Sequence, residues 1–313
     1  MNFETILTAL ITSLGISITA VVWLTKRLIN HRIGKDLELF KVKLLKDAQS
    51  EKIAKELDAK KDAEKFTGEL STRREYEMEA RKRLYMAIGP LKLQILLACR
   101  DLSGRVHTYG TRDRYNTNIN EHYGRSFLFR ILRPISICEL IERQIAFADF
   151  SVDDQAMDLL RFKKCVYAAF SGSSLTEGHP KVDWKSQIEH IYYDRLNHAA
   201  NELIVQEKDS APRIMRFDEF ERFAESKQAH KLLSPFPEIL ENFCPSDKPL
   251  FWLRLVGYGY LCNQLINKLG GNIGFERRCY DIETMLKVVS DETIVGDINT
   301  YCSRIRKMPE SPL

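Results

Sequence analysis

Arginine and aromatic residues are concentrated in one stretch of the chain, residues 100–133. The stretch contains seven arginines, three acidic residues and no lysine, and tyrosines, phenylalanines and asparagines lie between the arginines. A planar guanidinium binds phosphate through two parallel hydrogen bonds, and an aromatic face stacks on a nucleobase. The side chains that we expect to bind an oligonucleotide or a similar anion are Arg105, Arg112, Arg114, Tyr115, Arg125 and Arg130.

The same stretch also has a simpler interpretation. A solvated loop can carry arginines that pair with acidic residues elsewhere in the fold, or that contact anionic lipid headgroups. Composition does not distinguish these alternatives, because each of them requires positive charge near the surface.

Sequence motifs for catalysis and metal binding are absent. There is no glycine-rich phosphate loop, no H-E-x-x-H and no G-x-S-x-G. The seven cysteines are scattered and form no C-x-x-C pair, so they are typical of reduced thiols in the core of a cytoplasmic domain. We therefore predict a protein that is not an enzyme and that uses no metal and no cofactor.

The run from Thr5 to Thr25 contains no charged side chain, and Lys26 and Arg27 follow it directly. As a helix this run would be ~31 Å long, about the thickness of the hydrocarbon core of a bilayer. A signal peptide would instead have positive charge before the run and a small-residue cleavage site after it. We therefore expect a retained anchor, with its N-terminus outside and the remainder of the chain in the cytoplasm.

Small and hydroxyl-bearing residues form one stripe along this expected anchor. Alternating spacings of three and four place them on the same helical face, and they are Thr5, Thr8, Thr12, Gly15 and Thr19. Such residues let membrane helices pack closely and hydrogen-bond to one another. The stripe is compatible with a monomeric anchor, with a non-conducting bundle, or with a ring whose stripe lines a water-filled pore.

A charged segment without proline follows, over residues 26–83, with 17 Lys/Arg and 12 Asp/Glu. Its apolar residues recur in a 4-3-4 pattern at Ile33, Leu37, Phe40 and Leu44, which favours a coiled coil over a solvated single helix. The fold that we predict is all-α. It consists of a transmembrane helix at 1–25, a charged coiled-coil-like stalk at 26–83, and a helical cytoplasmic sensor or regulatory domain at 84–313.

Helical periodicity dominates after Gly89-Pro90, where the charge runs become shorter. The helices that we expect there lie near residues 91–102, 129–145, 155–169, 184–206, 218–233, 250–269 and 281–307. The apolar stretch 249–262 contains Arg254 and is short, so it predicts a buried helix and not a second membrane span.

Several short segments with helical patterns occur within this organisation. Residues 83–96 read RLYMAIGPLKLQIL, residues 101–106 read DLSGRV, and ILRPIS at 131–136 precedes IAFADF at 145–150. Over residues 1–170 the chain resembles the membrane effector of the Hailong anti-phage defence system. The resemblance implies a homo-oligomeric ion channel, such as a tetramer, in the bacterial inner membrane. It also implies that a partner nucleotidyltransferase makes short single strands of oligodeoxyadenylate DNA, which bind the channel and hold it inactive.

The sequence is therefore compatible with two functions. The first is a toxin-like antiviral effector whose pore opens when the oligonucleotide is lost, so that the membrane depolarises and growth stops. The alternative is a non-conducting single-pass scaffold or signalling protein whose helical domain docks a protein partner.

The pore hypothesis is tested most directly at Thr8 and Thr12. A Thr8→Leu/Thr12→Leu double variant removes two hydroxyls from the stripe and keeps the segment apolar. We expect normal membrane insertion but loss of most of the toxicity on expression, because leucine dewets a polar lining. Membrane fractionation and growth curves measure the two effects, and unchanged toxicity would refute the assignment of the stripe to a pore.

Overall fold

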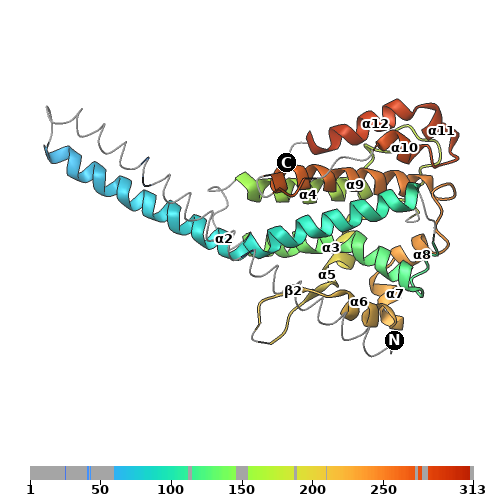
Figure 1. Ribbon diagram of the computed structural model, residues 1–313, viewed down its shortest axis with the longest axis horizontal. Coiled ribbons are helices and arrows are strands. Elements are labelled where there is room, and N and C mark those ends of the chain that lie inside the picture. The colour runs from blue at the N-terminus through green and yellow to red at the C-terminus, as the bar shows by residue number, and fades with distance from the viewer. Residues whose placement is uncertain are drawn as a thin grey trace. The chain divides into compact units, whose positions relative to one another are not determined.

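The computed structural model (Figure 1) describes Thr25, Lys41 and Lys43, and residues 60–111, 115–145, 154–186, 189–208, 210–271, 274–276 and 281–310. The described residues are mostly helical, which confirms the all-α class. The one described strand pair consists of two short antiparallel strands, β1 (Ile204–Val205) and β2 (Arg213–Ile214).

Within these described ranges, no helix is both long enough and apolar enough to cross a membrane. The predicted anchor lies outside them except for Thr25, which is helical, and so does the whole stripe of Thr5, Thr8, Thr12, Gly15 and Thr19. The apolar stripe predicted at residues 33–44 also lies outside them, although Lys41 and Lys43 between its members are helical and exposed.

The chain divides into two compact units, Met1–Leu93 with Gln144–Asp153, and Gln94–Arg143 with Asp154–Leu313. Helix α2 (Lys60–Thr111) continues through the predicted boundary at residues 83 and 84, and through Pro90. Its part in the first unit is highly charged and carries exposed ion pairs one turn apart, such as Arg73–Glu77 at 3.3 Å. Ala80, Leu84 and Ile88 recur at intervals of four and are buried, so this part of the helix has one narrow apolar face.

Helix α9 (Pro249–Gly270) forms the centre of the second unit and is buried along nearly its whole length. This confirms the buried helix that the sequence predicts. Proline at its first position suits a helix start, because the missing N–H would have no partner within the helix. Helix α4 (Asp154–Ser171) packs alongside α9, as Figure 1 shows.

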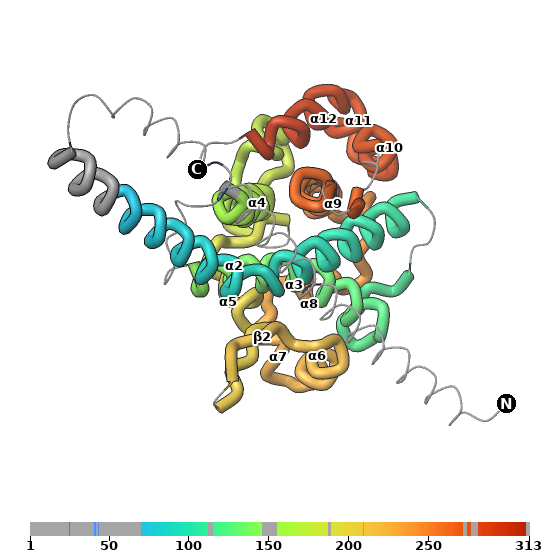
Figure 2. The backbone as a smooth tube through the Cα atoms, turned by 60° about the vertical axis from the view of Figure 1, so that its left-hand side comes forward, coloured from blue at the N-terminus to red at the C-terminus, as the bar shows by residue number. Residues whose placement is uncertain are grey.

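Three C-terminal elements also pack on α9 (Figure 2), namely α10 (Ile282–Leu286), α12 (Ile298–Lys307) and the short 3-10 helix η3 (Met308–Glu310). Helix α11 (Glu292–Gly296) packs on α12. The sequence predicts one helix over 281–307, but the chain makes three. The break between α10 and α11 follows local capping, since the carboxylate of Asp291 accepts hydrogen bonds from first-turn N–H groups of α11, as that of Asp281 does at the start of α10.

Helix α3 (His122–Ile145) is joined to α9 by the Tyr258 hydroxyl, which donates to the carbonyl of Ile131 at 3.2 Å. The hydroxyl of Tyr109 on α2 donates to the carbonyl of Phe243 at 2.6 Å. The remaining helices are α5 (Tyr193–Asn201), α6 (Phe217–Ala224), α7 (Lys227–Leu232) and α8 (Phe236–Leu240).

The helix predicted near 184–206 is much shorter in the structure, where α5 begins only at Tyr193. The preceding segment bonds to the end of α4 instead. The backbone N–H of Ile191 donates to the carbonyl of Phe170, and the His190 ring lies 2.8 Å from the carbonyl of Ser171. At His190 and Ile191, tertiary hydrogen bonds therefore replace the helical bonds that periodicity predicts.

Arg254 on α9 is fully buried and bonds to the same region. Its guanidinium donates to the carbonyls of Ala169 at 2.5 Å, Gly172 at 3.0 Å and Glu189 at 2.8 Å. Burial lowers the pKa of Arg254 to about 10, so the group stays charged at neutral pH. The charge is compensated by carbonyl dipoles, two of them at the C-terminal end of α4, where a cation is favoured.

An Arg254→Met variant should lower the free energy of unfolding by about 3–5 kcal/mol, because it leaves buried carbonyls without donors. Urea denaturation of the full chain measures the change. The matched control is Arg222→Met on α6, whose side chain is 74% exposed and pairs with Asp218 one turn away. Equal stability of the two variants would contradict the role given to Arg254.

Candidate anion-binding site

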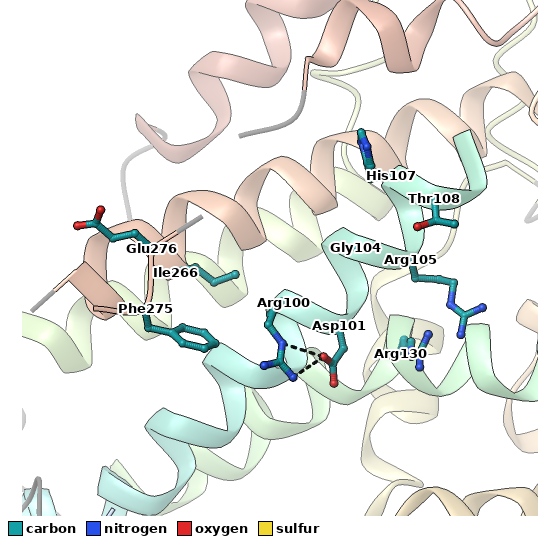
Figure 3. Close-up of a pocket in the computed structure, with 10 residues that line it drawn as sticks. All are labelled: Arg100, Asp101, Gly104, Arg105, His107, Thr108, Arg130, Ile266, Phe275 and Glu276. Atoms are coloured by element: carbon teal, nitrogen blue, oxygen red, sulfur yellow. Dashed lines mark hydrogen bonds and ion pairs between the residues drawn. The ribbon is translucent and has the colours of Figure 1, made fainter. Parts of the chain in front are cut away.

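An open pocket of about 600 Å³ lies where α2, α3 and the end of α9 meet in the second unit. Positions one helical turn apart on α2 supply most of its lining, because i and i+4 residues share a face. Figure 3 shows the lining residues, which are Arg100, Asp101, Gly104, Arg105, His107, Thr108, Arg130, Ile266, Phe275 and Glu276.

Arg105 of α2 extends toward α3 (Figure 3). Its guanidinium donates to the hydroxyl of Ser126 at 3.3 Å and lies 5.1 Å from the centre of the Tyr115 ring. Tyr115 belongs to an aromatic cluster with Tyr109 and Phe127. One face of the Arg105 side chain is thus held by aromatic packing, which orients a guanidinium without neutralising it.

The loop that carries Tyr115 is pressed against the first turn of α3. A Cβ at Gly124 would lie 1.9 Å from the carbonyl oxygen of Asn118, so only glycine permits this approach. Arg125 reinforces the loop by donating to the carbonyl of Asn120 at 2.8 Å. These contacts fix the position of Tyr115 beside Arg105.

Arg130 of α3 is half-buried, and within the described ranges no hydrogen bond or ion pair with its guanidinium is found. Burial lowers the pKa of Arg130 and the positive charge of Arg105 lowers it further, while the negative charge of Asp101 opposes both. Arg105 likewise has no ion pair with a carboxylate of the described residues. Two neighbouring guanidiniums therefore enter the pocket without an ion-paired or hydrogen-bonded carboxylate from the described residues, although the charge of Asp101 acts on Arg130 from nearby.

The carboxylate of Asp101 interacts with two other arginines, Arg100 and Arg133. Its carboxylate accepts two hydrogen bonds from Arg100, at 2.9 and 3.1 Å, and lies 3.8 Å from the Arg133 guanidinium. Burial lowers the pKa of Arg133, while the charge of Asp101 opposes that change. Glu276, the second acid of the lining, is exposed, and in Figure 3 its carboxylate points away from Arg105 and Arg130.

The structure brings together three of the residues predicted to bind an anion, namely Arg105, Tyr115 and Arg130. Arg125 is placed differently, because its guanidinium pairs with Glu221 at 3.2 Å and with Glu225 at 3.8 Å. It links α3 to the segment of α6 instead of facing the pocket. Arg112 and Arg114 lie outside the described residues.

Sequence reasoning did not select Arg100, Asp101 or Phe275 as site residues. Helical spacing could have indicated both arrangements, since Arg100 lies four residues before Gly104 and Asp101 lies four residues before Arg105. Phe275 has no such signal, since it reaches the pocket only through the turn after α9, where its N–H donates to the carbonyl of Gly270.

The pocket offers positive charge, a hydroxyl and aromatic surface, which together suit an anion with a planar group attached. No group of described residues could hold a metal ion.

No family model, curated protein or solved structure matches the chain. An antiviral channel is therefore supported by the resemblance over residues 1–170, by the charge pattern of the sequence and by this pocket.

An Arg105→Ala/Arg130→Ala double variant should weaken binding of a short oligodeoxyadenylate and flatten its dependence on salt. Each lost phosphate contact on a single strand lowers the slope of log K against log salt by about 0.7, so the double variant should lose about 1.4. Fluorescence anisotropy at several salt concentrations measures the slope.

The matched control for this test is Arg222→Ala, which removes an exposed arginine from α6, outside the pocket lining. It should bind like the unchanged chain. If the double variant keeps the affinity and the slope of the unchanged chain, the oligonucleotide does not bind through these two arginines.

Proposed function

We propose that this protein is a membrane-anchored effector that assembles into a homo-oligomer and conducts ions across the bacterial inner membrane. An oligonucleotide bound at the arginine pocket controls the pore. Loss of the ligand depolarises the membrane and arrests growth in defence against phage. The uncharged run before Lys26 and the basic residues after it support the anchor.

The observation that carries the proposal is the half-buried Arg130 beside Arg105, without a carboxylate partner from the described residues. Desolvation and a like charge both disfavour a guanidinium at this place. A bound polyanion relieves both costs, since charge-assisted hydrogen bonds to phosphate are among the strong ones. A surface arginine exposed to water would supply no such argument.

Ligand control of a pore requires a difference in affinity between two states of the protein. Arg105 belongs to α2 and Arg130 to α3, so an anion between them stabilises the arrangement in which these two helices are close. Helix α2 also contains residues of the predicted stalk. A change in the position of α2 after ligand loss is therefore the step that we propose for opening.

One observation favours the second function, a non-conducting scaffold. Three aromatic side chains before and at the start of α5 are exposed, namely Trp184 at 44%, Tyr192 at 38% and Tyr193 at 51%. Exposed tryptophan and tyrosine are enriched at protein interfaces. The scaffold would use this surface and would require neither a pore nor an anion.

Expression of the chain without the nucleotidyltransferase should depolarise bacterial cells, because no ligand then holds the pore closed. A voltage-sensitive dye reports the potential, and coexpression of the nucleotidyltransferase should restore it. Normal potential and normal growth, with the chain present in the membrane fraction, would contradict the channel and leave the scaffold as the better account.

A further inference from the structure

We infer that the pocket selects the terminal phosphate of an oligonucleotide, a phosphate monoester, over the phosphodiesters along the strand. The inference rests on the proposed function, because it names which part of the ligand binds at this same site. It follows from two features of the pocket, its uncompensated charge and its size.

The charge of the pocket exceeds what one phosphodiester neutralises. Arg105 and Arg130 adjoin each other without an ion-paired carboxylate from the described residues. The carboxylate of Asp101 pairs with Arg100 and Arg133, and its charge offsets that of Arg130 only from a longer range. A diester carries one negative charge, so it would neutralise only one of the two guanidiniums. A terminal monoester carries about 1.5 to 2 negative charges at pH 7 and has three acceptor oxygens.

The geometry also favours the end of a strand. A pocket of about 600 Å³ falls within the usual range for small-molecule sites, ~300–1,000 Å³, which is room for one terminal nucleotide. Phe275 lies at the opposite side of the lining from Arg130 (Figure 3), and the Arg100 guanidinium is 5.8 Å from the centre of its ring. Phe275 is only partly exposed, and it offers an aromatic face to the first base.

Asp101 adjusts the strength of the site in this account. By accepting bonds from Arg100 and lying near Arg133, it keeps these two arginines from adding their charge to the Arg105–Arg130 pair. Neutralising Asp101 should therefore strengthen binding of any phosphate, and this gain of affinity cannot result from misfolding.

The experiment compares three oligodeoxyadenylates of equal length on the full chain, one with a 5′-phosphate, one with a 3′-phosphate and one with neither. We expect one phosphorylated strand to bind about 10- to 100-fold more tightly than the unphosphorylated strand, as the loss of a charge-assisted hydrogen bond implies. The preference should fade between pH 7.5 and pH 5.5, because the second pKa of a monoester is about 6.

Three variants complete the test. Arg130→Ala should bind all three strands with similar affinity, Asp101→Asn should bind the preferred strand several-fold more tightly, and Arg222→Ala should behave like the unchanged chain. Equal affinity of the unchanged chain for the three strands would overturn this inference and leave the proposed function standing. Failure of all three strands to bind would overturn both.

Discussion

The buried guanidinium of Arg254 is the interaction on which the rest of the helical unit depends. A charge in the core is costly unless nearby dipoles replace the water that it loses. Here the carbonyls at the end of α4 and that of Glu189 provide this replacement. One side chain of α9 thereby determines where α4 ends and where the segment before α5 runs.

Helix α9 also holds the two helices that carry the pocket arginines. The Tyr258 hydroxyl bonds to the backbone of α3, and Trp252 packs against Tyr109 of α2 with ring centres 6.1 Å apart. Both arginine-bearing helices are therefore held by the same buried helix. Two guanidiniums repel each other, so holding them close together requires a rigid support of this kind. The packing of the core offsets this repulsion and keeps both positive charges at the pocket.

Much of the fold could be predicted from helical periodicity. The helical class, the buried helix at α9 and the helix at α4 follow from apolar residues at intervals of three and four. The conformation at His190 and Ile191 could not be predicted, since their hydrogen bonds go to the end of α4, about 20 residues earlier in the chain. Capping by Asp291 similarly starts a new helix within a region that periodicity treats as continuous.

The candidate site was predictable in part, for a related reason. Arginine-rich composition identified Arg105 and Arg130, but only the fold distinguishes these from Arg125, which pairs with Glu221. The roles of Asp101 and Phe275 depend on contacts between elements, which composition does not contain. The membrane span, the pore stripe and the ion conduction stay predictions, because residues 5–24 lie outside the described ranges.

Native mass spectrometry of the full chain, extracted from membranes in detergent, tests the central claim most directly because it reports subunit number and bound ligand together. The account predicts a single oligomer under both conditions. When the proposed partner nucleotidyltransferase is coexpressed, the oligomer should carry added mass equal to short oligonucleotides, and when that enzyme is absent, the oligomer should carry no added mass. A monomer that carries no added mass under both conditions would contradict the account.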